Sequence, residues 1–413
     1  MSLFCSCSKS GLKTEPTLIG ENWYYSASGV SNTDIVGFEY DSNTIFVYNI
    51  TSGIKKPVLK LPASRGLVDT PGLYGDKVVY ITGDKDFPSA GWSGSGKPNI
   101  DSNFVVSILD LKTGEVKDLT TDTHMKMLPG IFGDTVVWVD SRNSDVNYLP
   151  RNWDVYIYDL KENKETRLTL APTATRDSLA INADWIVWCD NRNGTSLNPF
   201  CYDVYAYDLK HGLEKRLSSV SSSEDWNISL NGNSVVWTDS RNVDATNSSY
   251  GYRDIYLYDL TNNEEQRITS SSGKDSFPVI DGNRIVWIQE TTELTDNMFV
   301  YDITTGQETQ ISHTGNAALH PPAISGNKVF WMESVIKEMP NDTGFEAGYP
   351  FITDIYLYNL DTKRQIALDL PAKASSGEAR QVPFYPAIIS DNYVLYDVGN
   401  HGGEGWTYLV KIN

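Results

Sequence analysis

Short runs of apolar residues, broken by glycine and asparagine, follow one another along the whole chain. Many of these runs end in an aromatic residue, as at residues 131–138, 280–287 and 324–331. Each has a central Gly-Asp or Gly-Asn pair, and glycine readily adopts the positive φ that a two-residue hairpin turn requires. The pattern predicts two short antiparallel strands joined by a tight turn, repeated many times.

A second motif follows each hairpin at a variable distance. Residues 154–160 read Asp-Val-Tyr-Ile-Tyr-Asp-Leu and residues 254–260 read Asp-Ile-Tyr-Leu-Tyr-Asp-Leu. Alternation with period two over such residues predicts a third strand, and another turn precedes a fourth, as at 265–269. No stretch has the apolar spacing and caps of a long amphipathic helix. Each repeat therefore predicts four strands, a to d, and the chain is expected to be all-β.

The repeat occurs eight times, and its weaker copies end at Tyr25, Tyr80 and Tyr396. Units of about 40 to 60 residues built from short strands are typical of a β-propeller. With 413 residues the chain exceeds the size at which one core keeps growing, whereas a propeller buries an interface between each pair of blades. We predict a single eight-bladed propeller over residues 1–413 with four-stranded antiparallel blades. Seven blades with an irregular first segment are the alternative.

The two ends of the chain must meet, because an open ring exposes strand edges. The first full repeat begins near Pro16, and the last, residues 386–413, ends after its third strand. The remaining chain lies at the N-terminus. Part of residues 2–12 is therefore predicted to supply the fourth strand of blade 8.

The run Val136-Val-Trp-Val-Asp-Ser-Arg-Asn143, followed by residues 154–160 and by Arg167-Leu-Thr169, resembles the TolB-type propeller repeat. Blades of that family carry an Asp-x-Arg-Asn turn, an aromatic Asp-Ile-Tyr strand and a closing Leu-Thr. The resemblance covers nearly the whole chain and is clearest over residues 127–313. It extends to repeats of bacterial and archaeal cell-surface proteins. It implies a propeller that works outside the cytoplasm, in the periplasm, in secreted form or on the cell surface.

The formal net charge is −19 and the isoelectric point is near 4.6. Such a surface repels phosphates, so nucleic acid and anionic membranes are poor partners. No apolar run reaches the roughly 18 residues of a membrane span, and no targeting segment is recognised. We expect a monomer.

Four cysteines leave two questions open. Cys189 ends strand b of blade 4 and Cys201 opens strand c, so the hairpin register places a disulfide within reach. Two unpaired small residues are the other possibility. Cys5 and Cys7 leave a lipid-modified N-terminus open as well.

The recurring tryptophans are predicted to pack between blades, since each large ring buries about 150 to 250 Å². They are Trp138, Trp188, Trp237, Trp287 and Trp331. The turn Asp140-Ser-Arg142-Asn143 recurs in blades 4 and 5 around Arg192 and Arg241. A catalytic site assembles once from different residues, whereas a structural element recurs. We expect each arginine to pair with an aspartate such as Asp154, Asp203 or Asp254; contact with a ligand or calcium is the alternative.

Long connections between strands b and c are expected at residues 83–102, 140–152, 239–252 and 333–353, on the face where the a strands enter. That face is the predicted site of function, because the opposite face carries tight turns with little concave surface. Around the mouth of the central channel the expected ligand-binding residues are Asp69, Lys126, Asp177, Trp226, Asp275, His320 and Tyr385.

Evidence for catalysis is sparse in the sequence. The five histidines have no metal-ligand spacing, and no Gly-x-Ser-x-Gly elbow is present. The main expectation is therefore an extracytoplasmic, non-catalytic binding or scaffolding module for protein or glycan ligands, with calcium as the only cofactor considered. The alternative is a polysaccharide lyase or glycosidase whose site is assembled at the channel mouth, where His124, His320, Lys126 and Arg176 could meet.

Overall fold

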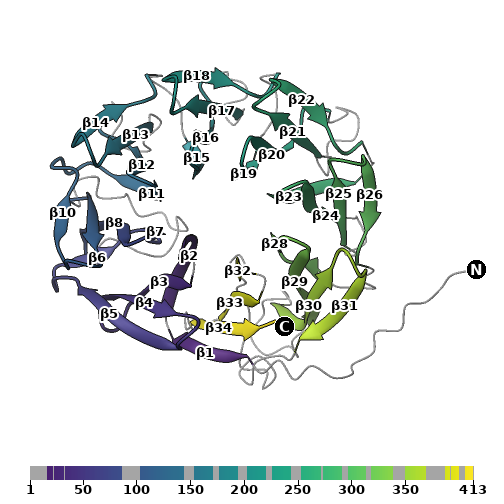
Figure 1. Cartoon of the computed structure of the whole chain (residues 1–413), viewed down its shortest axis with the longest axis horizontal. Helices are drawn as coiled ribbons and strands as arrows, with labels where there is room; N and C mark the ends of the chain where they lie inside the picture. The colour runs from purple at the N-terminus through teal and green to yellow at the C-terminus, as the bar shows by residue number, and fades with distance from the viewer. Residues whose placement is uncertain are drawn as a thin grey trace, which may run out of the picture.

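The computed structural model describes residues 16–21, 23–31, 33–85, 103–143, 153–170, 176–193, 202–219, 226–242, 253–270, 273–290, 296–312, 318–337, 349–368, 387–390, 392–399 and 405–412. Within these residues the chain forms eight antiparallel sheets set in a ring around a common axis (Figure 1). The predicted all-β, eight-bladed propeller is confirmed, and the seven-bladed alternative is wrong.

The strands of each blade follow one another from the axis to the rim. Blade 1 consists of β2 (Trp23–Ser31), β3 (Asp34–Glu39), β4 (Thr44–Asn49) and β5 (Ile54–Lys60); blade 2 of β6 (Arg65–Leu67), β7 (Gly72–Tyr74), β8 (Lys77–Asp84), β9 (Val105–Asp110) and β10 (Val116–Asp118). Blade 3 consists of β11 (Lys126–Phe132), β12 (Thr135–Asp140), β13 (Asp154–Asp159) and β14 (Lys164–Arg167); blade 4 of β15 (Arg176–Ile181), β16 (Trp185–Asp190), β17 (Asp203–Asp208) and β18 (Leu213–Arg216).

The second half of the ring repeats this order. Blade 5 consists of β19 (Trp226–Asn231), β20 (Ser234–Asp239), β21 (Asp254–Asp259) and β22 (Glu264–Arg267); blade 6 of β23 (Lys274–Asp281), β24 (Arg284–Glu290), β25 (Asn297–Asp302) and β26 (Gln307–Gln310). Blade 7 consists of β27 (Ala318–Leu319), β28 (Ala323–Ser325), β29 (Lys328–Lys337), β30 (Tyr349–Asn359) and β31 (Arg364–Leu368); blade 8 of β32 (Ala387–Ser390), β33 (Tyr393–Gly399), β34 (Gly405–Lys411) and β1 (Thr17–Glu21). In blades 2 and 7 two short segments share the place of strand a, since both pair with strand b.

Blade 8 is closed by the N-terminal strand, but not by the segment that the sequence predicts. The fourth strand is β1, which pairs antiparallel with β34 from Thr17 opposite Leu409 to Glu21 opposite Trp406. The prediction for residues 2–12 is therefore corrected, and those residues lie outside the described part of the chain. The reason is that strand a of blade 1 begins at Trp23, which leaves residues 17–21 available to complete the last sheet.

The same shift corrects the repeat in blade 1. Tyr25 lies on strand a, not on strand b, and pairs with Gly37 of strand b. On its other side Gly37 pairs with Phe46 of strand c. Trp138 pairs with Tyr156 in the same way in blade 3. Gly37 therefore takes the place of the repeated aromatic residue. A small residue in that place explains why the sequence motif is hard to recognise in blade 1.

The repeated tryptophans form the core between blades, as predicted. Trp138, Trp188, Trp237, Trp287 and Trp331 expose at most 1% of their surface. Trp138 stacks on Tyr156 with 5.9 Å between ring centroids, and both pack in one apolar cluster with Trp188 of the next blade. Because each blade buries its aromatic face against its neighbour, the strand ends are held at fixed positions on the two faces of the ring.

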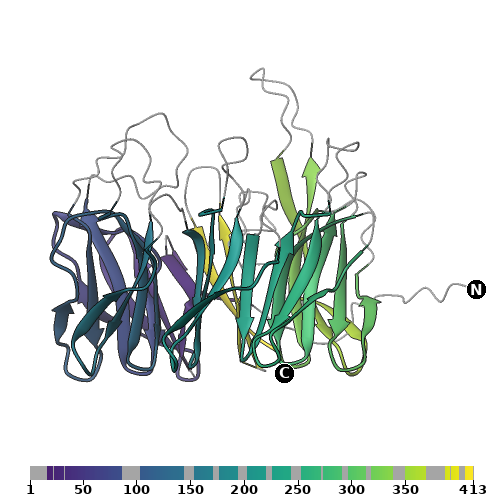
Figure 2. The same ribbon diagram turned by 90° about the horizontal axis from the view of Figure 1, so that it is seen from above.

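We name the two faces by the ends of the strands. The short-turn face carries the tight connections from strand a to b and from c to d, which lie together on one side of the ring in Figure 2. On the opposite face, here called the b–c face, strands b end and strands c begin. Most of the long connections predicted there lie outside the described residues. Within the predicted loop 333–353, however, the structure continues β29 to Lys337 and begins β30 at Tyr349, so this part is an extended hairpin that rises above the other blades (Figure 2).

Candidate active site at the end of blade 7

The Asp-x-Arg-Asn turn is a structural element in blades 3 to 5. In blade 3 the Asp140 carboxylate accepts hydrogen bonds from Trp138 Nε1 at 3.0 Å and from the Arg142 backbone at 2.9 Å. The Arg142 guanidinium contacts Asp140 at 2.6 Å and Glu165 at 2.7 Å, and it lies over the Tyr156 ring, 4.2 Å from its centroid. The turn thus neutralises a fully buried carboxylate at the end of strand b.

The neighbouring carboxylate on strand c is neutralised by other groups. Asn143 Nδ2 donates to Asp154 at 2.9 Å, Arg167 contacts it at 2.8 Å and Thr169 Oγ1 donates to it at 3.0 Å. The expected pairing of Arg142 with Asp154 is therefore wrong, because Arg142 turns back to the aspartate two residues before it. Asp190 and Asp203 in blade 4, and Asp239 and Asp254 in blade 5, repeat this arrangement around Arg192 and Arg241.

Two of the predicted ligand-binding residues have no exposed surface. Lys126, at the start of β11, is 0% exposed and donates to Asp122 at 2.7 Å and to the His124 carbonyl at 2.9 Å. Asp275 on β23 is also 0% exposed and accepts hydrogen bonds from Trp287 Nε1 at 3.2 Å and from Gln289 at 3.0 Å. Both side chains stabilise the interior of a blade in this structure, and neither reaches the surface.

Asp69 is half-buried in blade 2. Its carboxylate accepts hydrogen bonds from the backbone of Thr70 and, at 2.7 Å, from the backbone of Leu128 in blade 3. Burial raises the pKa of Asp69, and these backbone donors oppose the rise. The residue therefore links two blades close to the predicted mouth.

The remaining predicted residues are placed only in part. Asp177 lies on β15, and Trp226 begins β19 and pairs with Thr238. Tyr385 lies outside the described residues, as does Cys201, so the possible disulfide with Cys189 is not tested. Cys189 itself pairs in register with Val204.

His320 directly follows β27, the segment of strand a in blade 7 that lies nearer the b–c face and pairs with Glu333 and Ser334. Its backbone N–H donates to the Met332 carbonyl at 3.0 Å, and its Nε2 lies 3.0 Å from Ser334 Oγ. Burial lowers the pKa of His320 to about 4, because a charged imidazolium loses its hydration there. His320 is therefore neutral at physiological pH.

Beside His320, blade 7 departs from the repeated turn. Glu333 pairs across the strands with Asp354, as Asp140 pairs with Asp154. Trp331 Nε1 donates to Glu333 at 3.2 Å, which matches the bond from Trp138 to Asp140. Both carboxylates of the pair are thus retained at the end of the blade.

The positions that neutralise the pair in blade 3 carry apolar residues in blade 7. Val335 and Ile336 stand two and three residues after Glu333, where Arg142 and Asn143 follow Asp140. Ala367 faces Tyr356 on the outer strand, where Arg167 faces Tyr156. The sequence of blade 7 therefore keeps the two acids of the repeat and replaces the arginines and the asparagine that bind them in blades 3 to 5.

This environment raises the pKa of Glu333 to about 6, chiefly through burial and further through the nearby charge of Asp354, while the Trp331 hydrogen bond opposes the shift. Two neighbouring groups whose pKa values are shifted in opposite directions, His320 downward and Glu333 upward, are the pattern expected of acid–base chemistry. Of these three residues only His320 is predicted from the sequence; Glu333 and Asp354 are not. The available signal was that blade 7 contains Trp331-Met-Glu333-Ser-Val335 where blade 3 contains Trp138-Val-Asp140-Ser-Arg142.

In the part of the chain that the structure describes, no group of three or more His, Cys, Asp or Glu residues is placed to hold a metal ion. The described residues likewise contain no helix long and apolar enough to cross a membrane. Calcium binding stays a prediction.

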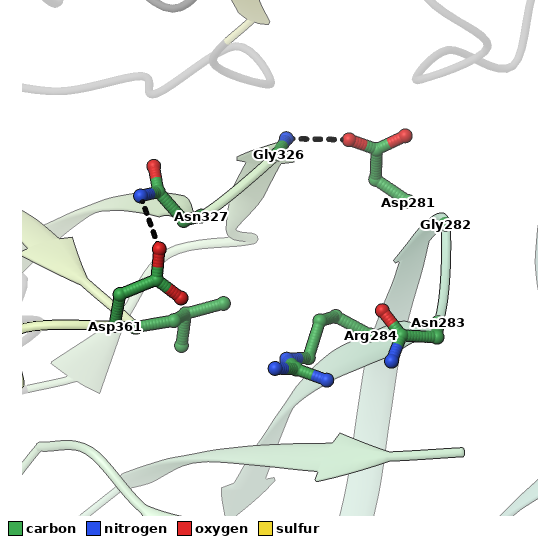
Figure 3. A pocket seen from close by; sticks show the side chains of 8 residues that line it. Asp281, Gly282, Asn283, Arg284, Gly326, Asn327 and Asp361 are labelled. Carbon is green, nitrogen blue, oxygen red and sulfur yellow. Dashed lines mark hydrogen bonds between the residues drawn. The ribbon is translucent and has the colours of Figure 1, made fainter. Parts of the chain in front are cut away.

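The short-turn face is not flat, contrary to the expectation. Between blades 6 and 7 it has a pocket of about 270 Å³ formed by the two a–b turns and by the end of β30 (Figure 3). The side chains that follow the two turns do not fill the space between the blades. The sequences of the turns alone do not predict this pocket.

No family model and no curated protein matches this chain. Solved structures do match it. A prolyl endopeptidase structure is 12% identical, with 91% of this chain and 56% of that chain covered and a TM-score of 0.54. The oligogalacturonate lyase of Vibrio parahaemolyticus is 12% identical, with 97% and 99% covered and a TM-score of 0.50. TolB from Acinetobacter baumannii is 14% identical, with 82% and 77% covered and a TM-score of 0.35.

These similarities establish a β-propeller, and the chain spans little more than half of the endopeptidase. They also correct the main functional expectation. Three matched structures reach a TM-score of 0.50 or more, and they are a prolyl endopeptidase, an oligogalacturonate lyase and a puromycin hydrolase. This finding contradicts the expectation of a non-catalytic binding or scaffolding module and favours its alternative. The similarity to TolB is too weak to assign the repeats to that family.

Proposed function

We propose that this propeller is a carbohydrate-active enzyme of the glycosidase or polysaccharide lyase type, with Glu333 and Asp354 as its acid–base pair. The observation that carries the proposal is the retention of both carboxylates in blade 7 together with the pKa of about 6 for Glu333. In blades 3 to 5 the same pair is bound by arginine and asparagine, whereas blade 7 carries valine, isoleucine and alanine at those positions.

The carboxylate pair favours hydrolysis of a glycosidic bond. Glu333 would donate its proton to the leaving oxygen as the glycosidic C–O bond breaks, and Asp354 would accept a proton from the attacking water. A neutral His320 can hydrogen-bond a sugar hydroxyl beside them. The net charge of −19 favours neutral glycans over polyanionic ones, because like charges repel.

The comparison with solved structures supports a site within the propeller itself. The oligogalacturonate lyase of Vibrio parahaemolyticus is covered over 99% of its length by this chain. A propeller of this size is therefore large enough to carry a lyase site. Asp69, Asp177, Trp226 and Tyr385 stay predictions for contacts to the remainder of a glycan.

The resemblance of the repeats to TolB-type and cell-surface propellers supports a place outside the cytoplasm, where glycan substrates are accessible. Fractionation of the native host with an antibody to this chain tests it. Recovery in the cytoplasmic fraction would contradict this part of the proposal.

Activity is tested by incubating the chain with neutral gluco-, galacto-, xylo- and manno-oligosaccharides and with oligogalacturonides. New reducing ends report cleavage, and ultraviolet absorbance of an unsaturated product distinguishes elimination from hydrolysis. Glu333→Gln should lower kcat/KM by about 10²- to 10⁴-fold, the usual contribution of a general acid.

The matched control is Glu308→Gln, which removes one carboxylate from the exposed part of the outer strand β26 and should leave kcat/KM unchanged. Thermal unfolding verifies that both variants are folded. Absence of cleavage across the whole panel, or full activity in Glu333→Gln, would refute the proposal.

A further inference from the structure

The pocket on the short-turn face lies in the crevice between blades 6 and 7, away from the strand ends that carry Glu333. Its lining residues are Asp281, Gly282, Asn283, Arg284, Gly326, Asn327, Leu360 and Asp361. Figure 3 shows Asn283 and Arg284 on one side of the space and Asn327 and Asp361 on the other. The walls therefore come from two separate blades.

Two other crevices of the ring are bridged by the first residue of strand b. In blade 2 that residue is Lys77, and its Nζ contacts Asp134 of blade 3 at 2.5 Å. In blade 4 it is Trp185, whose Nε1 donates to Asn233 of blade 5 at 2.9 Å. A long side chain at this position thus reaches the turn of the next blade and occupies the crevice.

Blade 6 uses the position differently. Its first strand b residue is Arg284, which forms an ion pair with Asp302 of its own blade. Across the crevice, Asn327 donates to Asp361 within blade 7 at 2.8 Å. Each wall is therefore tied to its own blade, and the crevice between them stays open.

The inner end of the pocket is nevertheless fixed. Asp281, at the end of strand a, accepts a hydrogen bond from the Gly326 backbone of blade 7 at 2.6 Å (Figure 3). On its other side Asp281 accepts from Asn231 of blade 5 at 3.0 Å. These bonds hold three blades in register, so the pocket is preformed, as small-molecule sites usually are.

We propose that this pocket binds one neutral sugar residue, as a second carbohydrate site on the face opposite the acid–base pair. Sugar hydroxyls both donate and accept hydrogen bonds, and the walls offer both kinds of partner: carboxylates that accept and a guanidinium and amides that donate. Leu360 adds an apolar surface for the C–H groups of the ring. An anionic ligand would meet Asp281 and Asp361, and a metal cation would meet Arg284.

Binding is tested with D-galactose, D-glucose and D-mannose, using saturation-transfer NMR and calorimetry on the whole chain. These monosaccharides have no glycosidic bond to cleave, so the result is independent of the proposed activity. We expect at least one of them to bind with a Kd on the order of 1 mM, about −4 kcal/mol.

The decisive variant is Arg284→Trp, which places at this position the residue that bridges the crevice between blades 4 and 5. It should weaken binding by about tenfold or more while thermal unfolding stays close to that of the wild type. Ser234→Trp, the same change at the equivalent position of blade 5, is the control and should leave the Kd unchanged. Asn283→Ala, a smaller change in the same wall, replaces Arg284→Trp if that variant fails to fold and should also weaken binding. No binding of any of the three sugars, or equal binding in the wild type and the folded wall variant, would overturn the proposal.

Discussion

Blades 3 to 5 and blade 7 place the same pair of acids at the same ends of strands b and c, and they differ in what surrounds it. In blade 4 the pair is Asp190 and Asp203, both fully buried and bound by arginines and an asparagine. In blade 7 it is Glu333 and Asp354, and the corresponding positions carry valine, isoleucine and alanine. The arrangement that recurs in blades 3 to 5 is therefore a structural element. Blade 7 keeps the two acids without the residues that bind them, and this departure indicates a functional site.

The largest loss of stability is expected from the arginine–aspartate ion pair that is most deeply buried. In blade 5 the Arg241 side chain is 8% exposed and the Asp239 side chain 0%. Arg241→Ala should lower the free energy of unfolding by about 3 kcal/mol, because it leaves a buried carboxylate without its charge partner. Urea unfolding at neutral pH measures the loss. A change below about 0.5 kcal/mol would show that the turn is not a structural element.

Acid should destabilise the protein through His320. Its pKa is about 4 in the folded protein against an ordinary value of 6.5, so the folded state binds fewer protons than the unfolded state between these values. The stability that His320 contributes is complete above about pH 6.5 and is lost as the pH falls toward 4, by up to about 3 kcal/mol. Urea unfolding of the wild type and of His320→Gln at about pH 7 and pH 4 isolates this contribution. Equal acid losses in the two proteins would contradict it.

Glu333 should have the opposite pH dependence. Its pKa is raised from 4.5 to about 6, so the ionised form destabilises the folded state, and the cost grows from about pH 4.5 and is complete above pH 6. Glu333→Gln should therefore be more stable than the wild type at pH 7 to 8, by up to about 2 kcal/mol, and equally stable near pH 4. A functional acid held at a cost in stability behaves in this way. A destabilised Glu333→Gln at pH 8 would assign Glu333 to the structural class.

The smallest change restores part of the structural turn in blade 7. Ala367→Arg puts an arginine at the position of Arg167, which contacts Asp154 in blade 3. The new side chain should pair with Asp354 and stabilise the fold by about 1 kcal/mol, while any glycan-cleaving activity is lost. Thermal unfolding and the cleavage assay measure the two effects together. Retained activity in a stabilised variant would show that Asp354 takes no part in catalysis.

The repeat made the fold predictable, because its turns and its aromatic residues are local signals. Closure of blade 8 by an N-terminal strand was predicted, but the strand was assigned to residues 2–12 instead of β1. The cause was that the first strand of blade 1 was placed too early in the sequence. Lys126 and Asp275 were expected at the surface, and only the packing of the blades shows that both are enclosed. Register was the missing information for Ala367, because its equivalence to Arg167 depends on strand pairing and not on spacing along the chain. Glu333 stands two residues after Trp331 as Asp140 stands two residues after Trp138, so the spacing held a signal for Glu333.

Titration of the Glu333 carboxyl is the most direct test of the contrast between the two kinds of blade. Carbon-13 labelling of the glutamate side chains, with Glu333→Gln used to assign the resonance, gives its pKa in the folded protein. We expect a value of about 6. A value at or below the ordinary 4.5 would contradict the proposed acid–base site.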